Sequence, residues 1–466
     1  MKLAQLIECE KRLADLKIKG ITNDSRKVKK DYLFVNTQNN PEYDFDAVKN
    51  GALAVVSKFD FGFSNQIIVE NTTDAFSKIS ANWFSNPSKD LILLGVTGTN
   101  GKTSVTYMLK SILEKAGHKV GVIGTIQNII GDEIIPSINT TPNAYYLNEL
   151  FALMKKKGCE YVIMEVSSHG LAANNVLNLN FRVAMFTNLT QDHLDFHGNM
   201  ENYYLAKKKL FSMCETAVIN VDDDYGKRLL NEINCNTATY SLESNSDYIA
   251  KGIKYSPKGV NYELLAEGLT HIKVNTAGKF SVYNSLCAIA CALQIGIPLD
   301  VITDALLQLK GIKGRAEVVP NTKDFTVVID YAHTPDGLKN ILRTFKECRK
   351  NRLIVLFGCG GDRDKTKRSI MGEIASHYAD YVIVTSDNPR TEDKGEIIKD
   401  ILKGVQNGQT GYKVIEDRQE AIKFALSFAQ KDDIIVLAGK GHETYQIIGK
   451  QKFPFDEREI IRQYLG

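Results

Sequence analysis

The sequence has little excess charge and no long apolar run, and these absences narrow the classes of protein it can encode. Its 58 lysines and arginines stand against 55 acidic residues, and the net charge of +3 predicts neither nucleic-acid nor membrane-surface binding. No stretch reaches transmembrane length, and residues 1–20 carry scattered charges where a secretory signal has an apolar core. We therefore expect a cytoplasmic monomer without nucleic-acid or membrane partners.

The 8 cysteines lack the CxxC spacing of zinc and redox sites, and their scatter fits a reduced cytoplasm best. There is no low-complexity tract, and 43% hydrophobic and 24% charged residues are typical of a globular protein. A chain of 466 residues exceeds what one hydrophobic core usually supports, so two to four domains are expected.

The segment LLGVTGTNGKTS at residues 93–104 joins a strand-like apolar run to a glycine loop, a lysine, a hydroxyl residue and a helical pattern. Glycines let backbone amides approach a phosphate, Lys102 neutralises it and Thr103 can hold Mg²⁺. The strict Walker spacing fails by one residue, because the first glycine is Gly95, and an ordinary strand-to-helix connection is the alternative. The predicted phosphate-binding residues are Gly98, Thr99, Asn100, Gly101, Lys102, Thr103 and Ser104.

Apolar runs alternate with helical patterns twice along the chain, first over the middle third and again from about residue 318. This alternation predicts α/β domains with largely parallel sheets and helices on both faces. Residues 1–88 form a third, smaller unit with short strand candidates and a helix ending near Trp83. We expect domains at 1–88, 89–317 and 318–466.

Glu165 ends the apolar run YVIME, where a carboxylate can hold Mg²⁺ or cap the next turn. The spacing of His193 and His197 would also suit a transition metal, although no further His or Cys cluster supports a closed zinc site. Lys207 opens a lysine run that would ordinarily be a solvated helix face.

Polar loops follow each apolar run of the last third, where α/β sheets bind ligands. Asp330 is either a ligand contact or a turn cap, and Arg315 either a contact or a surface ion pair. The segment SDNPRTED is an Asx-Pro turn by default. Arg390 within it and Arg363 upstream are planar forks suited to a carboxylate-bearing substrate.

Eight motifs in order along the chain are similar to those of the Mur ligase family: GTNGKTS, NTTP, EVSSHGL, FTNLTQDHLDFHG, DYAHTPD, GCGGDRDKTKR, DNPR and GKGHETYQ. The resemblance implies a small N-terminal α/β domain for a UDP sugar, a central P-loop ATPase domain and a C-terminal Rossmann-like domain for an amino acid. It implies an ATP-dependent amide ligase, with Mg²⁺, that adds meso-diaminopimelate to UDP-MurNAc-L-Ala-D-Glu through an acyl phosphate in peptidoglycan synthesis.

The resemblance also implies roles for individual residues. Lys102, Lys207 and His193 would be catalytic, and Lys207 would carry a carbamate. The metal ligands would be Thr103, Glu165, His193 and the Lys207 carbamate. Asn284, Arg315 and Asp330 would join the P-loop in binding ATP, and Ser25, Thr140, Thr141 and Ser167 would bind the UDP-MurNAc-dipeptide. The diaminopimelate pocket would comprise Arg363, Asp387, Asn388, Pro389, Arg390, Gly439 and Glu443.

Three departures from the family pattern are Ala173, Asn175 and Ser281, and residues 1–88 match weakly. The alternatives within the enzyme class are a ligase that adds L-lysine and a folylpolyglutamate synthase-like ligase. DNPR and GKGHE argue against the second, and an unpaired Arg390 would penalise lysine. A P-loop switch that binds nucleotide without ligation is the alternative outside that class.

Overall fold

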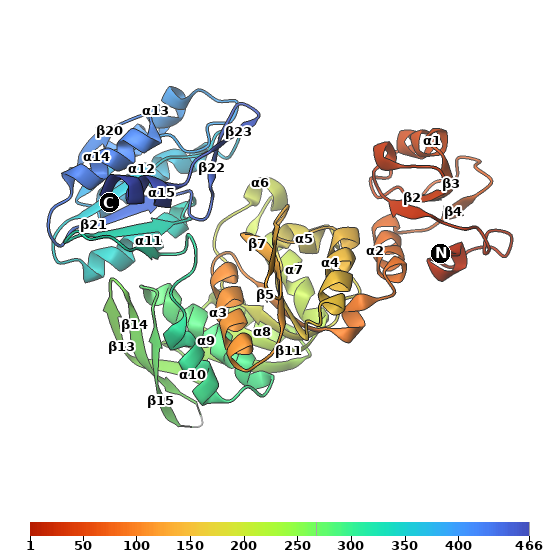
Figure 1. Ribbon diagram of the computed structural model, residues 1–466, viewed down its shortest axis with the longest axis horizontal. Coiled ribbons are helices and arrows are strands. Elements are labelled where there is room, and N and C mark those ends of the chain that lie inside the picture. The colour runs from red at the N-terminus through yellow and green to blue at the C-terminus, as the bar shows by residue number, and fades with distance from the viewer. Residues whose placement is uncertain (267, 466) are drawn as a thin grey trace.

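The computed structural model describes residues 1–266 and 268–465, so Glu267 and the predicted domain end at Gly466 lie outside the described residues. Three lobes follow one another along the chain (Figure 1). Each contains a sheet whose strands are mainly parallel, as the alternating pattern predicted. The α/β fold class is therefore confirmed.

The N-terminal lobe holds a parallel sheet in the order β1-β2-β3-β4. Its strands are β1 (Gly20–Thr22), β2 (Tyr32–Val35), β3 (Ala52–Ser57) and β4 (Gln66–Ile68), with helices α1 (Pro41–Lys49) and α2 (Thr72–Trp83). The side chain of Asn71 caps α2 by accepting from the amides of Thr73 and Asp74. The predicted helix ending near Trp83 is thus confirmed, whereas α1 and β1 were not foreseen.

The central lobe is built on an 11-stranded sheet in the order β15-β14-β13-β12-β11-β10-β5-β9-β6-β7-β8. The strands are β5 (Ile92–Thr97), β6 (Val120–Ile123), β7 (Gln127–Ile130), β8 (Glu133–Pro136), β9 (Tyr161–Glu165), β10 (Phe181–Phe186), β11 (Cys214–Asn220), β12 (Asn236–Ser241), β13 (Tyr248–Ser256), β14 (Gly259–Leu265) and β15 (Leu269–Val274). The helices are α3 (Lys102–Lys115), α4 (Ala144–Lys156), α5 (Ser168–Ala172), α6 (Leu194–His197), α7 (Met200–Lys208), α8 (Asp224–Glu232), α9 (Lys279–Gln294) and α10 (Leu299–Gln308).

Side chains of this sheet alternate between two apolar cores. Val183 and Met185 of β10 pack with α3, α9 and α10, whereas Ala184 and Phe186 pack with α4 and α7. Because both faces are covered, the central strands read as continuous apolar runs. The antiparallel pairs β13–β14, β14–β15, β6–β7 and β7–β8 extend the sheet at its two edges and were not foreseen.

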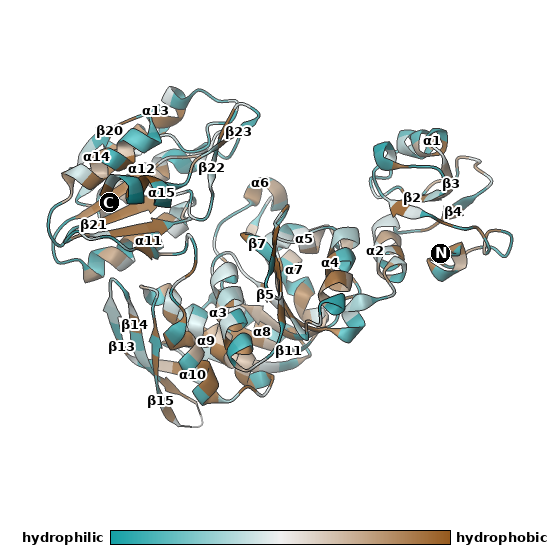
Figure 2. Cartoon of the chain, in the orientation of Figure 1, coloured by the Kyte–Doolittle hydropathy of each residue, from teal (hydrophilic) through white to brown (hydrophobic). Residues whose placement is uncertain are grey.

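The C-terminal lobe has a sheet in the order β16-β17-β21-β18-β19-β20 and a hairpin of β22 and β23. Its strands are β16 (Glu317–Val319), β17 (Thr326–Asp330), β18 (Leu353–Phe357), β19 (Tyr381–Val384), β20 (Gly411–Val414), β21 (Ile434–Ala438), β22 (Tyr445–Ile448) and β23 (Gln451–Pro454). The helices are α11 (Pro335–Cys348), α12 (Thr366–Tyr378), α13 (Lys394–Val405), α14 (Arg418–Phe428) and α15 (Glu457–Leu465). The hydrophobic strands of this sheet lie between helices whose outer faces are hydrophilic (Figure 2).

Strand β16 straddles the expected boundary between residues 317 and 318, and the three domain ranges stay predictions. Over residues 1–266 and 268–465, no helix combines the length and apolar character that crossing a membrane requires.

Candidate active site

A cavity of about 910 Å³ lies between the central and C-terminal lobes. Loops after β5, β9 and β10 line one side, and the loop after β17 with the start of α11 lines the other. These are carboxyl ends of parallel strands, where α/β sheets bind ligands. The predicted site residues that line the cavity are Thr99, Asn100, Gly101, Lys102, Thr103, Ser104, Thr140, Thr141, Glu165, Ser167, His193, Asn284, Arg315 and Asp330.

The glycine loop after β5 has the backbone shape that close approach to a phosphate requires. Gly98 has φ +148°, and a Cβ there would lie 1.9 Å from Oγ1 of Thr187. Lys102, the first residue of α3, donates to the carbonyls of Gly98 at 2.8 Å and Thr99 at 2.9 Å. Burial lowers the pKa of Lys102. The lysine and the amide-rich start of a 14-residue helix thus present positive charge to the cavity.

Glu165 gathers hydroxyl groups at the inner end of the cavity. Its Oε2 accepts from Oγ1 of Thr103 at 3.0 Å and from Oγ1 of Thr125 at 2.9 Å, and its Oε1 accepts from the amide of Thr125. Thr140 lies 3.0 Å from Thr125, hydroxyl to hydroxyl, and Thr141 donates to the carbonyl of Glu165 at 2.9 Å. Carboxylate and hydroxyl oxygens are the hard ligands that Mg²⁺ prefers, so this oxygen set fits the ion.

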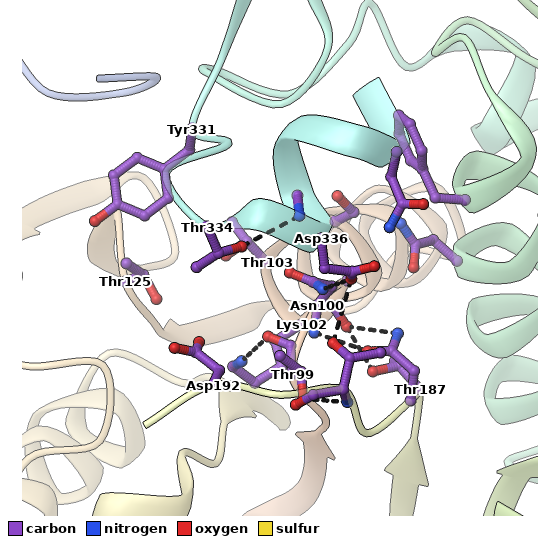
Figure 3. Close-up of a pocket in the computed structure, with 18 of the residues that line it drawn as sticks. Thr99, Asn100, Lys102, Thr103, Thr125, Thr187, Asp192, Tyr331, Thr334 and Asp336 are labelled. Atoms are coloured by element: carbon purple, nitrogen blue, oxygen red, sulfur yellow. Dashed lines mark hydrogen bonds between the residues drawn. The ribbon is translucent and has the colours of Figure 1, made fainter. Parts of the chain in front are cut away.

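Side-chain hydrogen bonds cross the cavity between the two lobes. Nδ2 of Asn100 donates to Oδ2 of Asp336 at 3.0 Å, and Oγ1 of Thr190 donates to the same oxygen at 3.2 Å. Figure 3 shows Asp336, near the start of α11, directed at Asn100 of the glycine loop. Arg315 donates to Oγ1 of Thr103 at 3.1 Å and lies over the ring of Tyr331. Arg315 therefore reaches the phosphate loop and is not the surface ion pair that the sequence left open.

Asp330 is engaged by backbone amides. Its Oδ2 accepts from the amide of Ala316 at 2.6 Å and its Oδ1 from the amide of Ala332 at 2.8 Å. Burial raises the pKa of Asp330 against the effect of these amides. These are the contacts of a turn cap, and they hold the linker into the C-terminal lobe beside the cavity.

Lys207 lies beneath the glycine loop. The side chain is buried, and its Nζ donates to the carbonyl of Gly98 at 2.8 Å, the carbonyl that also accepts from Lys102. Burial, with a contribution from Lys102, lowers the pKa of Lys207 well below its usual value. Lys207 is thus no solvated helix face, although Lys209 is exposed as that pattern expects.

His193 and His197 have different surroundings. Nε2 of His193 lies 3.3 Å from Oδ2 of Asp192, and burial lowers the pKa of His193 to about 4, so the ring is neutral near pH 7. Nε2 of His197 is hydrogen-bonded to Ser168 at 2.9 Å, and its ring stacks on Tyr203. No group of three or more His, Cys, Asp or Glu side chains suited to a metal occurs within residues 1–266 and 268–465. The two histidines therefore do not form a closed transition-metal site there.

The residues expected to bind the amino substrate form a separate cluster in the C-terminal lobe. Nδ2 of Asn388 donates to Oε2 of Glu443 at 2.9 Å, and Lys440 donates to both of these side chains at 3.1 Å. The glycine at 439 has φ +109°, and a Cβ there would lie 2.7 Å from Oδ2 of Asp387. The DNPR and GKGHE loops therefore meet beyond the ends of β19 and β21.

Arg390 is held by the β22–β23 hairpin. Its backbone is left-handed, with φ +51°, and its amide donates to the carbonyl of Ile447 at 3.2 Å while its carbonyl accepts from Gly449 at 2.7 Å. Its Nη1 donates to the carbonyl of Gly361 at 2.7 Å. Pro389 is buried beside it, and Arg363 is exposed on the neighbouring loop. None of the seven predicted pocket residues lines the cavity between the lobes.

Ser25 is buried in the N-terminal lobe, where its carbonyl accepts from Asn50, and it does not line the cavity. Of the three positions that depart from the family pattern, Ala173 and Asn175 line the cavity, and the side chain of Asn175 donates to the carbonyl of Thr141 at 3.3 Å. The third, Ser281 in the first turn of α9, donates to the carbonyl of Ala277, which precedes that helix.

Several cavity residues were not among the predicted ones, notably Thr125, His169, Phe196, Tyr331 and Asp336. Thr125, Tyr331 and Asp336 follow apolar runs, and that strand-end position was their available signal. The exposed ring of Phe196 lies 4.2 Å from that of His169, centroid to centroid, a contact that the sequence does not indicate.

Comparison with known proteins assigns the chain to a family. Residues 96–292 match the Mur ligase middle domain, and residues 314–441 match the Mur ligase, glutamate ligase domain. A UDP-N-acetylmuramoyl-L-alanyl-D-glutamate--2,6-diaminopimelate ligase of Caldanaerobacter subterraneus subsp. tengcongensis is 50% identical over 96% of this chain and 95% of its own length. The ligase 1 of that name from Clostridium acetobutylicum is 46% identical, over 97% and 95%.

Solved structures agree with this assignment. A structure of a ligase with the same name has 33% identity and a TM-score of 0.74, covering 100% of this chain and 98% of that one. A MurF ligase from Thermotoga maritima in complex with ADP has 18% identity and a TM-score of 0.64, with coverage of 100% and 98%, and shares the fold. With both domain matches and near full-length relatives, the chain belongs to the Mur ligase family.

Proposed function

We propose that this protein is an ATP-dependent ligase that joins meso-diaminopimelate to the D-glutamate of UDP-MurNAc-L-Ala-D-Glu and releases ADP and phosphate. The observation that carries the proposal is 50% identity, over 96% of the chain, to a ligase named for that reaction. The phosphate loop and the DNPR pocket have the chemistry that the reaction requires. A reaction with these substrates and products would belong to cytoplasmic peptidoglycan precursor synthesis.

The reaction needs a leaving group on a carboxylate, because a carboxylate is a poor electrophile. Transfer of the γ-phosphoryl group of ATP to the D-glutamate side chain gives an acyl phosphate, and attack by the amine gives a tetrahedral intermediate that collapses to amide and phosphate. Both stages bring anions together in the cavity. Lys102 and the first amides of α3 stabilise the developing charge. Asn284 and Arg315 border the same space and complete the nucleotide site.

Thr103 and Glu165 would hold one Mg²⁺, because their oxygens lie 3.0 Å apart beside Lys102. The ion would supply positive charge that draws the phosphate and carboxylate oxygens together. For a second ion, neutral His193 offers a nitrogen. Lys207 would contribute only as a carbamate, since a buried ammonium repels a cation. The amine of Lys207 is buried under the glycine loop and donates to a carbonyl there, so it lies beside the phosphate site.

Thr140, Thr141 and Ser167 line the same cavity, and their hydroxyls and backbone suit the peptide end of the UDP substrate. Ser25 would meet the uridine nucleotide from the N-terminal lobe. Because the amino-substrate cluster does not line this cavity, the lobes must approach each other before amine and acyl phosphate react.

Arg390 favours meso-diaminopimelate over L-lysine. Its guanidinium donates to the carbonyl of Gly361 while the hairpin holds its backbone, and this planar fork matches the distal carboxylate of diaminopimelate. Lysine lacks that carboxylate and would leave the fork without its partner, which costs binding free energy.

The test is phosphate release by the purified protein with Mg-ATP and UDP-MurNAc-L-Ala-D-Glu, in the presence of meso-diaminopimelate, L-lysine or no amine. The expected result is release that depends on meso-diaminopimelate, with a product whose mass has grown by one diaminopimelyl residue. Lys102→Met is the matched inactive control, since it removes the charge and keeps the length of the side chain. Preference for lysine would keep the ligase and overturn the role of Arg390. Absence of amine-dependent release with either would favour another acceptor or a nucleotide switch.

A further inference from the structure

A buried ion pair lies behind the amino-substrate cluster and contacts none of the cavity between the lobes. Arg418, the first residue of α14, and Glu457, the first residue of α15, are both fully buried, and Nε of Arg418 donates to Oε1 of Glu457 at 2.9 Å. Nη2 of Arg418 donates to the carbonyl of Ala438 at 2.8 Å, the last residue of β21. The arginine thus joins both helices to the strand end that precedes Gly439.

Among residues 1–266 and 268–465, one nitrogen of this guanidinium has no hydrogen-bond partner. This is Nη1 of Arg418, which is buried and lies 3.9 Å from Oδ2 of Asp387. The other oxygen of Asp387, Oδ1, accepts from the amide of Asn388 at 2.6 Å. Arg418 is therefore directed at the DNPR carboxylate at a separation just longer than a hydrogen bond, while its shorter ion pair is with Glu457.

The charges of Arg418, Glu457 and Asp387 together decide whether the Asp387 carboxylate is available to a charged ligand. Glu457 balances the charge of Arg418, so Asp387 keeps negative charge for a cationic partner. A diamino acid brings ammonium groups, and Asp387 lies next to Gly439 and Asn388, in the predicted pocket. If the charge of Glu457 were removed, the buried guanidinium would pair with the nearest remaining carboxylate, because an unpaired buried charge is costly.

We propose that the Arg418–Glu457 pair positions Asp387 and leaves its charge free for an ammonium of the amino substrate, so that both are positioning residues for that pocket. The inference rests on the proposed function. It predicts the direction in which the KM for meso-diaminopimelate changes in two variants. Glu457→Gln frees the guanidinium to pair with Asp387, and the KM for meso-diaminopimelate rises by about tenfold, equivalent to about 1.4 kcal/mol. Arg418→Met/Glu457→Gln removes both charges, and the KM returns toward the wild-type value.

The experiment measures KM for meso-diaminopimelate, ATP and UDP-MurNAc-L-Ala-D-Glu, together with thermal midpoints, in wild type and both variants. The matched control is Asp433→Asn, which breaks the ion pair between buried Asp433 and partly exposed Arg352 just before the opposite end of β21. A merely structural role predicts that all variants lose stability while no KM moves selectively. The positioning role predicts a rise only in the diaminopimelate KM, only in Glu457→Gln, with recovery in the double variant.

Unchanged diaminopimelate KM in an active, folded Glu457→Gln protein would overturn the inference and leave the proposed function intact. A double variant whose diaminopimelate KM stays as high as that of Glu457→Gln would also overturn it, because pairing between Arg418 and Asp387 could not then cause the rise. If that double variant does not fold, Arg418→Gln/Glu457→Gln serves in its place. It also removes both charges and keeps a donor for the carbonyl of Ala438, so the KM should again recover. A wild-type protein without amine-dependent phosphate release would refute the proposed function and this inference together.

Discussion

Replacing Arg390 with alanine should reduce the use of meso-diaminopimelate far more than the use of L-lysine. Nη1 of Arg390 is fixed by the carbonyl of Gly361 at 2.7 Å, so the fork is oriented before substrate arrives. Alanine keeps a Cβ at this left-handed position, with φ +51°, so the backbone penalty of the site changes little. The variant therefore isolates the guanidinium.

The magnitude follows from the contact that is lost. A charge-assisted, two-pronged bond between arginine and a carboxylate contributes about 2–3 kcal/mol. Loss of that amount lowers kcat/KM for meso-diaminopimelate by about 30- to 160-fold. The partial exposure of Arg390 favours the lower end. L-lysine cannot form the contact, so its kcat/KM should change little, and the KM for ATP should stay as in wild type.

The assay is amine-dependent phosphate release with each amine in turn. Arg349→Ala is the control, because it removes a C-terminal-lobe arginine whose Nε lies 3.0 Å from Oδ2 of Asp380 in a surface ion pair. Equal losses with meso-diaminopimelate and L-lysine would show that Arg390 supports the fold of the loop and does not read the distal carboxylate.

Three further predictions concern the phosphate loop, the buried lysine and the response to pH. Gly98→Ala should abolish turnover because its Cβ would meet Thr187 at 1.9 Å. Gly117→Ala should cost stability alone, because Gly117 has φ +91° and a Cβ there would meet no atom of the described residues beyond its chain neighbours within 4 Å. Equal activity in both variants would contradict the phosphate-loop geometry. Lys207→Ala should lose turnover and regain part of it with short carboxylic acids, and full activity without them would rule out a carbamate. Burial lowers the pKa of His442 from 6.5 to about 3. Below pH 6.5, His442 is protonated in the unfolded chain but stays neutral in the folded one. The free energy of unfolding is therefore largest above pH 6.5 and decreases as the pH falls toward 3. The thermal midpoint of His442→Gln should drop less than that of wild type between about pH 7.5 and 5.5, and an equal drop would assign the loss to other groups.

Much of the architecture was readable because parallel strands buried on both faces are continuous apolar runs. The cores of β5, β9, β18 and β21 fall within the predicted runs, and the polar loops after them hold the site residues. The short β1 carries no such run. The antiparallel strands β14 and β15 alternate in burial, and β13 buries only Ile249 and Ala250, so these strands lack a continuous apolar run and were missed.

Local patterns along the chain specify part of the chemistry: the glycine loop with Lys102 at a helix start, the strand-end carboxylate of Glu165, and the turn that carries Arg390. Which of these groups meet depends on how distant elements pack. Asn100 and Asp336 pair across 236 positions, Lys207 is buried beneath Gly98, and Arg418 faces Asp387 from the start of α14. Backbone preferences act over a few residues and leave a sequence signature, whereas the partner of a buried charge is set by packing between distant elements. The same lysine run can therefore encode a solvated face or a buried amine, and only the fold distinguishes them.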